Sequence, residues 1–558
     1  MNRKKAIPCL VAAVALTAGC RGDAERSRES AAAWVEAGSE DRVPVHDRYG
    51  GTLVVAGRNE ALSMNALVSN DYESLQLQIY VLFVTLVRAD REYEPQPGLA
   101  RSWEFNDDTT EVVFHLRGDV RWHDGVTVTA QDVVFTFDRL KDPETGFVNP
   151  SYFDYWEAAE AVDDTTARFY LRPHANLLYG WMRTAVMPKH VLGAVSAAQL
   201  DGDPFGTSTP VGNGPFRFVE RVAGDRWVFE ANPDFPEALG GRPYVDRIVY
   251  RQIPDEFALM ASLQAGEVDV VLDATPEMLA RLGRDPEVVP VSYPAPDYQF
   301  IAWNGRREPL GDRQVRRALT MAIDRETLVE VLRGGYGTVA VGPVGPWHWA
   351  WDSSWKPLPY APDSAAALLD AAGWIDTDGD GVRDRGGVPM RFDLISTPRR
   401  EWSAIQTLVQ ADLARVGVDV RPEVREQGAL VPLVTSADRR FDAVLLGWAR
   451  DVPLDDRDLW ACDRIGQPVQ FTSYCNPGLD PVLDSIRLTA DRGRLRALVR
   501  RYQEFIAADQ PYTFLYYVDR IDLLRTRVRG VEVDSRGDWT GVTRWWIHPA
   551  ARRNRTSR

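Results

Sequence analysis

The chain has 558 residues, of which 45% are hydrophobic and 26% are charged. This length exceeds one ordinary hydrophobic core, so we expect two or three lobes, and the composition is that of a globular rather than a disordered protein. The formal net charge of −15 argues against nucleic acid and against an anionic membrane surface as binding partners. The 18 tryptophans suit either hydrophobic cores or a ligand pocket.

The first residues have the pattern of an export signal. A basic stretch at 3–5 precedes an apolar run at 6–18, which is too short to span a bilayer as a permanent helix. The run ends in LTAGC, which resembles a lipoprotein cleavage box except that Thr17 stands where Leu is usual. We therefore predict a signal peptide and a mature chain that starts at Cys20, whose several acyl chains hold it on a membrane. An ordinary secretory signal is the alternative.

The next elements follow from composition and periodicity. Residues 20–49 are rich in Arg, Glu, Asp, Ser and Ala and have little to bury, which predicts a flexible tether. A β-rich run at 51–56 opens the folded part, and the apolar stretch 72–87 predicts a buried helix. Residues 99–140 read LARSWEFNDDTTEVVFHLRGDVRWHDGVTVTAQDVVFTFDRL, and their alternation predicts a strand at 112–117.

The same stretch continues with turn residues at 123–125 and with Thr129, which can cap a short helix over 130–137. After a loop-rich segment at 206–214, the chain has the pattern of alternating strands and helices, which indicates an α/β fold. The predicted strands are 216–219, 247–250, 267–271, 298–304, 417–420, 441–448, 511–518 and 528–533, and the predicted helices are 257–265, 313–325, 362–372, 402–416 and 492–509.

Three of these segments resemble one known family. The stretch 99–140, the helix VRRALTMAIDR at 315–325 and the segment YAPDSAAALLDAAGW at 360–374 are similar to signatures of the extracytoplasmic solute-binding proteins of peptide and nickel ABC transporters, solute-binding family 5. The resemblance runs from about residue 51 to 533. It implies a bilobal periplasmic-binding-protein fold of the large, three-subdomain cluster C type, which closes about a hinge on its ligand.

The patterns described above and the resemblance together give limits for each part of the chain. These are a signal peptide at 1–19, the tether at 20–49, lobe I at 50–87, 207–303 and 507–550, an extra scaffold subdomain of lobe I at 88–206, lobe II at 304–506, and a basic tail at 551–558.

The implied function is the substrate-binding component of an ABC importer. Such a protein captures oligopeptide-like solutes outside the cytoplasm, which is the periplasmic space if the cell is Gram-negative, and as a monomer delivers them to the membrane permease. A binder of nickel chelates or another small solute, a sensory or chaperone lipoprotein and a hydrolase are the alternatives. The sequence has no nucleophile elbow, zinc-protease or phosphate-loop motif, so no catalytic residue and no required cofactor is predicted.

His123 is either an acid, base or metal ligand or a structural turn residue, and the resemblance favours the structural interpretation.

The segment from Gly447 to Asp451 resembles the family's GW..D motif. The resemblance implies that Asp451 binds the α-ammonium of the ligand, that Gly447 offers backbone hydrogen bonds to an extended peptide, and that Trp448 forms an apolar wall. Arg399 and Arg400 lie in the loop where some peptide binders hold the ligand carboxylate, and either guanidinium can bind it through two hydrogen bonds.

Residues 376–387 have the spacing of a calcium-binding loop. Position twelve is Gly387 instead of the usual bidentate Glu, and 389–395 has the pattern of a strand instead of a second helix. A structural calcium ion and a solvated acidic turn therefore remain alternatives. The ligand oxygens would come from Asp376, Asp378, Asp380, Val382 and Asp384.

Cys462 and Cys475 are the two cysteines left after Cys9 in the signal peptide and Cys20 at the lipid anchor. In an exported chain, two thiols this close in sequence predict a disulfide. A zinc site is disfavoured because no histidines lie nearby to complete four ligands.

Overall fold

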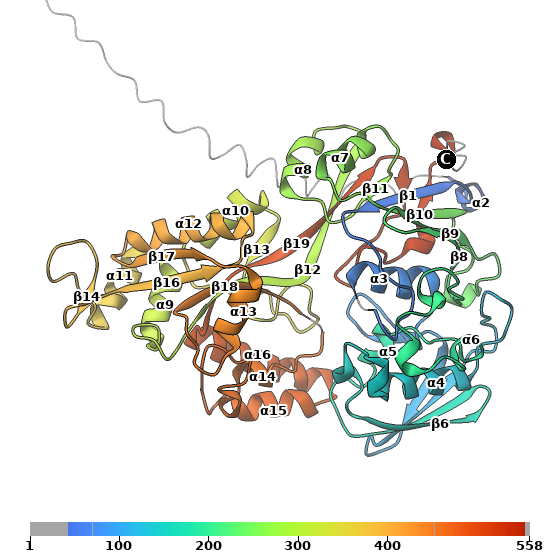
Figure 1. Ribbon diagram of the computed structural model, residues 1–558, viewed down its shortest axis with the longest axis horizontal. Helices are drawn as coiled ribbons and strands as arrows, with labels where there is room; N and C mark the ends of the chain where they lie inside the picture. Colours follow the sequence, from blue (N-terminus) through green and yellow to red (C-terminus); the bar gives the residue numbers. More distant parts are fainter. Residues whose placement is uncertain (1–42, 70, 451, 553–558) are drawn as a thin grey trace, which may run out of the picture.

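The computed structural model describes residues 43–69, 71–450 and 452–552. The predicted signal peptide, Cys20, most of the tether, Asp451 and the end of the basic tail lie outside these residues. Two bodies with separate hydrophobic cores are joined by two long antiparallel strands, β12 (Val288–Trp303) and β19 (Tyr512–Arg525) (Figure 1). We call lobe I the body formed by 43–297 and 519–552, and lobe II the body formed by 298–518.

Both joining strands contribute to both cores. In β12, Val291 packs in a core of lobe I while Phe300 packs in a core of lobe II, and in β19 Phe514 and Leu524 divide in the same way. The pairing of the two strands shifts register between Pro294 and Tyr298. The crossing therefore lies inside the strands, and not at the predicted limits of 303/304 and 506/507, because each strand is long enough to bury side chains in two bodies.

The main sheet has eleven strands and runs through both lobes. Its order is β17-β16-β18-β12-β19-β11-β1-β10-β9-β8, with β13 (Gly337–Val339) paired to β19. The other members are β17 (Asp419–Val424), β16 (Arg391–Ser396), β18 (Ala443–Ala449), β11 (Val270–Val271), β1 (Thr52–Gly57), β10 (Arg247–Gln252), β9 (Arg226–Ala231) and β8 (Phe216–Val222).

In lobe II, helices cover both faces of the sheet (Figure 1). Odd-numbered residues such as Ile301 and Leu445 pack under α9 (Arg313–Ala322) and α12 (Arg400–Ala414). Even-numbered residues such as Phe300 and Val444 pack against α15 (Asp480–Leu488) and α16 (Arg492–Asp509). This division follows from the alternation of side chains along a strand. The helices are α9 (Arg313–Ala322), α10 (Arg325–Arg333), α11 (Pro362–Ala371), α12 (Arg400–Ala414), α13 (Gln427–Thr435), α14 (Arg457–Trp460), α15 (Asp480–Leu488) and α16 (Arg492–Asp509).

Lobe I contains the β-α-β unit in which α7 (Glu256–Gln264) joins β10 to β11 on either side of β1. A separate four-stranded sheet, β4-β5-β7-β6, carries the stretch 99–140. Its strand β5 (Glu111–Leu116) alternates buried and partly buried residues, and Thr129 with Asp132 forms a capping box on α4 (Ala130–Lys141). The remaining elements are α2 (Val45–Arg48), α3 (Tyr72–Leu77), α5 (Tyr179–Arg183), α6 (Lys189–Leu192), α8 (Pro276–Leu282), β2 (Val87–Ala89), β3 (Pro95–Pro97), β4 (Ala100–Phe105), β6 (Trp156–Asp163), β7 (Thr166–Leu171), β20 (Val528–Arg529) and β21 (Trp546–Ile547), with a hairpin of β14 (Asp384–Arg385) and β15 (Val388–Pro389) in lobe II.

The predicted α/β fold is confirmed, but several elements differ from the prediction. Of the strands expected at 267–271 and 528–533, only Val270–Val271 and Val528–Arg529 form. The helix expected at 72–87 ends after a π-helical turn at Gln78–Leu82, because the Leu82 carbonyl accepts hydrogen bonds from the backbone of Asn213 and Gly214. The helix expected at 313–325 is broken where Asp324 caps α10. Tyr49 already packs on Tyr244, so the packed chain begins before the predicted end of the tether. Within the described residues, no helix is both long and apolar enough to cross a membrane.

Candidate functional site

Strand β18 has, at its carboxyl-terminal half, a backbone edge with which no strand among the described residues pairs. On one side it pairs with β12 from Ala443 to Ala449, whereas on the other side β16 pairs only with Ala443 and Val444. Asn304 donates its N–H to the Asp442 carbonyl, and Arg450 donates to the Pro296 carbonyl. Because bonded pairs alternate along an antiparallel ladder, even-numbered residues of β18 face β12. The N–H and C=O of Gly447 and Ala449 therefore face the unpaired side.

Gly447 lies opposite Gln299 of β12. A Cβ atom at Gly447 would lie 2.5 Å from Oε1 of Gln299, closer than van der Waals contact allows. A residue without a side chain is therefore required if the Gln299 amide is to occupy this place.

Trp448 belongs to a stack of aromatic rings on the even-numbered face. Its ring centroid lies 6.2 Å from that of Phe300 and 6.3 Å from that of Phe471. Phe300 in turn stacks on Tyr512 at 4.1 Å. The indole, itself half-buried, is thus supported by rings from two neighbouring strands and a loop, which makes it a rigid apolar surface.

The residues on either side of Asp451 are held by buried polar contacts. Arg450 forms an ion pair with Asp456, whose side chain is 1% exposed, and Tyr502 donates to the same carboxylate at 2.5 Å. Burial opposes the charged guanidinium, but Asp456 raises the pKa of Arg450 well above its usual range. On the other side, the Val452 carbonyl accepts a hydrogen bond from Nε2 of His348 at 2.9 Å. The backbone on both sides of Asp451 is therefore fixed.

The side chains of the two candidate arginines contact different groups. Arg399 precedes α12, is exposed, and lies with its guanidinium 4.7 Å from the ring centre of Trp402. Arg400 is exposed as well, but it pairs at 3.2 Å with Glu277 on α8 of lobe I. Arg400 therefore already holds a carboxylate across the two lobes, whereas Arg399 stays within lobe II.

The sequence comparisons agree with this architecture. A family model described as bacterial extracellular solute-binding proteins, family 5 Middle, matches residues 94–466. The chain belongs to this family. The family predicted from the sequence motifs is thereby confirmed.

Among relatives of this family 5 protein, the oligopeptide-binding protein AppA of Bacillus subtilis (strain 168) is 31% identical over 506 residues, which cover 90% of this chain and 92% of AppA. The solved structure of AppA in complex with a nonapeptide has a TM-score of 0.70 at 30% identity and covers 90% of this chain and 99% of that chain. The dipeptide-binding protein of Escherichia coli (strain K12) is 27% identical and covers 79% of this chain and 84% of its own length. NikZ from Campylobacter jejuni in complex with Ni(L-His) shares the fold, with a TM-score of 0.71 at 24% identity and coverage of 90% and 100%.

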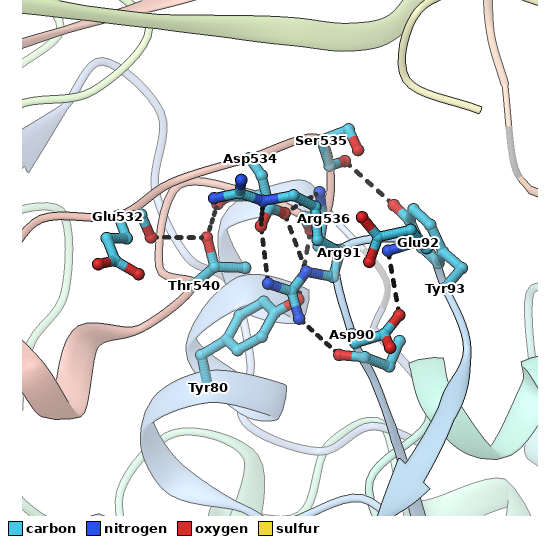
Figure 2. A network of polar contacts seen from close by, with 12 residues as sticks. Tyr80, Asp90, Arg91, Glu92, Tyr93, Glu532, Asp534, Ser535, Arg536 and Thr540 are labelled. Atoms are coloured by element: carbon cyan, nitrogen blue, oxygen red, sulfur yellow. Dashed lines mark hydrogen bonds and ion pairs between the residues drawn. The ribbon is translucent and has the colours of Figure 1, made fainter. Parts of the chain in front are cut away.

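The lobes of the family 5 protein also meet near the β2–β3 turn. Arg536 donates two hydrogen bonds to the Asp534 carboxylate and one to the Ala89 carbonyl (Figure 2). Tyr93 donates to the Ser535 carbonyl at 3.1 Å, and the Ser535 hydroxyl donates to the Trp347 carbonyl of lobe II at 3.3 Å. Arg492 of α16 reaches the same turn, donates to the Glu92 carbonyl at 2.6 Å and pairs with Glu94.

Beside this network, lobe I has a cavity of about 650 Å³ lined by Tyr80, Arg88, Arg183, Phe235 and Trp539 among others. Gly447, Trp448, Arg399 and Arg400 do not line it. The predicted ligand residues are therefore not grouped around this cavity. Gly447 lies on the β18 edge and Trp448 in the aromatic stack, whereas Arg399 contacts Trp402 and Arg400 contacts Glu277.

His123 lies in the turn of the signature stretch, where Nε2 contacts the Gly214 carbonyl at 3.1 Å. Burial lowers the pKa of His123 to about 4, so the ring is neutral at physiological pH and donates this hydrogen bond. The contact joins the scaffold sheet to the loop before β8, which is a structural role.

Cys462 and Cys475 form a disulfide between Cα atoms 4.7 Å apart. It joins the segment after α14 to the loop before α15.

Three of the four predicted calcium-loop carboxylates come together. Oxygens of Asp376, Asp378 and Asp384 lie within 4.8 Å of one another, whereas Asp380 instead accepts a hydrogen bond from the Val382 amide at 2.8 Å. Asp384 also accepts from Thr377, and the chain continues into a hairpin and not a helix. The donor set fits a hard cation such as Ca²⁺, with fewer ligands than an EF-hand supplies.

Calcium is therefore a testable prediction. With 1 mM Ca²⁺ and a dissociation constant near 0.1 mM, in the range of extracellular modules, binding would stabilise the protein by about 1.4 kcal/mol. We expect the melting temperature to rise with calcium, to return after chelation, and to be insensitive to both in Asp378→Asn. An unchanged melt of the unmodified chain with and without chelator would remove the site.

Proposed function

We propose that this protein is the substrate-binding component of an ABC importer that captures oligopeptide-like solutes outside the cytoplasm and delivers them to the membrane permease. The observation that carries the proposal is the unpaired edge of β18, where Gly447 and Ala449 turn their backbone groups away from β12. An extended peptide can add to such an edge as a further strand. The names of the relatives that bind oligopeptides and dipeptides support this interpretation.

In this function each residue of the motif has a distinct role. The peptide backbone bonds to Gly447, one of its side chains packs on Trp448, and its ammonium group pairs with Asp451. Arg399 binds the carboxylate, because Arg400 is engaged by Glu277. Binding between the lobes favours the arrangement in which they are in contact, and that arrangement is what a permease recognises.

The remaining parts of the proposal concern the location of the protein. The chain is exported by the signal at 1–19, anchored by lipid at Cys20, and acts as a monomer in the periplasmic space if the cell is Gram-negative. Mass spectrometry of the intact protein released from membranes tests the anchor, because acylation adds a defined mass to Cys20.

Replacement of Asp451 tests the site. We expect Asp451→Ala to weaken binding of peptide by about tenfold to a hundredfold, since hydrogen bonds to charged groups contribute roughly 1.5–3 kcal/mol. Calorimetric titration of the protein after removal of copurified ligand measures this, and mass spectrometry of that ligand identifies the solute. Asp458→Ala, an exposed aspartate of the same lobe, is the matched control. Equal affinity in Asp451→Ala and the control would show that the site is wrongly assigned.

A further inference from the structure

Two unsatisfied oxygen acceptors lie on β12 beside the β18 edge. Asp297 pairs with Ala449 and Gln299 pairs with Gly447, so both side chains lie on the odd-numbered face of the sheet, the face that α12 covers. Neither residue belongs to a sequence motif; Gln299 enters the site described above only as the side chain opposite Gly447, and Asp297 does not enter it.

Gln299 directs its amide toward the edge strand. Its Oε1 atom lies over Gly447, at the place where a Cβ would otherwise be. This oxygen is buried and accepts no hydrogen bond from any residue that the structure describes. A buried amide oxygen without a donor destabilises the fold, which points to a donor supplied from elsewhere.

Asp297 is half-buried at the crossing between the lobes, next to the register shift of β12. Among the described residues, no hydrogen bond or ion pair to its carboxylate is present. Burial raises the pKa of Asp297, while Arg520 and Arg333 lower it from a distance and Asp273 raises it. A carboxylate in such a place is stabilised by a cation that comes close enough to pair with it.

The groups around these two acceptors are engaged with one another. Tyr516, which pairs with Gln299 from the other neighbouring strand, donates its hydroxyl to Glu401 of α12 at 2.8 Å. Arg333 donates to the Asp519 carbonyl at 3.1 Å and lies 3.9 Å from Glu401. The Tyr516 hydroxyl and both Nη atoms of Arg333 thus contact other groups, whereas Nε of Arg333 has no acceptor among the described residues. None of these donors bonds to Asp297 or Gln299, which remain as adjacent acceptors.

From these observations we propose that Asp297 and Gln299 form a subsite for a cationic side chain, lysine or arginine, of the bound peptide. The inference rests on the proposed function and specifies its substrate class. Neighbouring strands lie about 4.8 Å apart, so a peptide added to β18 runs about 10 Å from β12. Only a long side chain reaches Asp297 from there, and it passes over Gly447 and Ala449, the two smallest residues of the edge.

The same geometry predicts which peptide positions matter. Side chains alternate between the two faces of an added strand. Residues that face α12 meet Asp297 and Gln299, whereas their neighbours meet the ring stack of Trp448. The preferred ligand therefore carries a basic residue next to an apolar or aromatic one.

Matched peptides test the subsite. The probes are alanine-based nonapeptides with a single lysine, norleucine or glutamate moved along the sequence, titrated by calorimetry into ligand-free protein. We expect lysine to bind about tenfold more tightly than norleucine at the position that faces Asp297, as a charge-assisted hydrogen bond would give. Asp297→Asn should abolish this preference and leave norleucine peptides unchanged. Glu423→Gln, which removes a charge from β17 where Glu423 pairs with Arg425, should leave the preference intact.

The outcomes separate the two proposals. A tenfold preference that Asp297→Asn removes establishes the subsite. If the peptides bind without a lysine preference at any position, or if Asp297→Asn and Glu423→Gln reduce it equally, the subsite is wrong and the peptide-binding function stands. If no peptide binds the unmodified protein, both fail. Asp297→Asn keeps the size of the side chain, and its melting temperature confirms that it is folded.

Discussion

Replacement of Asp456 by Asn is expected to destabilise lobe II by about 3–5 kcal/mol, the range for removal of one member of a buried ion pair. The side chains of Arg450 and Asp456 are only 14% and 1% exposed, so the remaining guanidinium would be buried without a counter-charge. The same change removes the charged acceptor of Tyr502, which itself accepts a hydrogen bond from Trp460 at 2.6 Å. Thermal melting and urea unfolding of the ligand-free protein measure the loss.

Asp458→Asn provides the matched control for this prediction. Asp458 is 69% exposed and pairs with Arg464 at 3.3 Å, so its replacement should cost less than about 1 kcal/mol. The double variant Arg450→Met with Asp456→Leu should regain much of the stability, because apolar residues of similar size often replace a buried pair without loss. The peptide affinity of the double variant should be lower than that of the unmodified protein even if its stability is regained, because Arg450 is the residue before Asp451 in the sequence. Similar melting of Asp456→Asn and Asp458→Asn would contradict the role of the ion pair.

Elements with a strong local pattern were predictable. Strand β5 alternates, α4 begins at a capping box, and α16 has apolar residues at helical spacing over the whole predicted range 492–509. The helix predicted at 72–87 was wrong beyond Leu82 because hydrogen bonds from residues some 130 positions away, at Asn213 and Gly214, take over the Leu82 carbonyl. Local periodicity carries no information about such a partner.

Strand β12 shows a second limit. It is 16 residues long, but it contains Pro290, Pro294 and Pro296, which disfavour a strand by sequence rules, so only its end was predicted. Pro294 lies at the shift in pairing between the lobes, where the ladder is irregular in any case. In PAPDYQF, Asp297 directly follows two prolines and directly precedes a buried strand. This pattern is the sequence signal that could have drawn attention to Asp297.

The residues of the candidate site also divide into those that the sequence predicts and those that only the fold brings together. The family motif supplied Gly447 and Trp448, because both are adjacent in sequence. It could not supply His348 or Gln299, because their contacts join segments that meet only through the sheet and the cores around it. Asp456 lies six residues after Arg450 and therefore beyond the motif. The motif therefore predicts where a backbone is bound, while the side chains that orient the site become visible only in the fold.

The folded protein should lose stability as the pH falls from about 6.5 to 4, in part through His348. Nδ1 of His348 accepts a hydrogen bond from the Ala350 amide at 3.0 Å, so Nε2 carries the proton that it donates to the Val452 carbonyl. Burial lowers the pKa of His348 to about 4; Arg492 and Arg450 lower it further, while the Val452 carbonyl and Asp456 oppose the shift. The unfolded chain takes up the proton first as the pH falls, because its histidine titrates near 6.5. The contribution is therefore complete above pH 6.5 and declines by up to about 3 kcal/mol toward pH 4.

The variant His348→Gln separates this histidine from the others with a lowered pKa, His123 and His174. The introduced side-chain amide can still donate to the Val452 carbonyl but cannot titrate, so the melting temperature of this variant should fall less steeply between pH 6.5 and 4. His46→Gln is the control, since the side chain of His46 is 80% exposed. Identical pH profiles for the unmodified protein and both variants would show that protonation of His348 is not linked to folding. A shallower profile only for His348→Gln would show that its neutral form holds the loop at Val452, one residue from the proposed ammonium ligand Asp451.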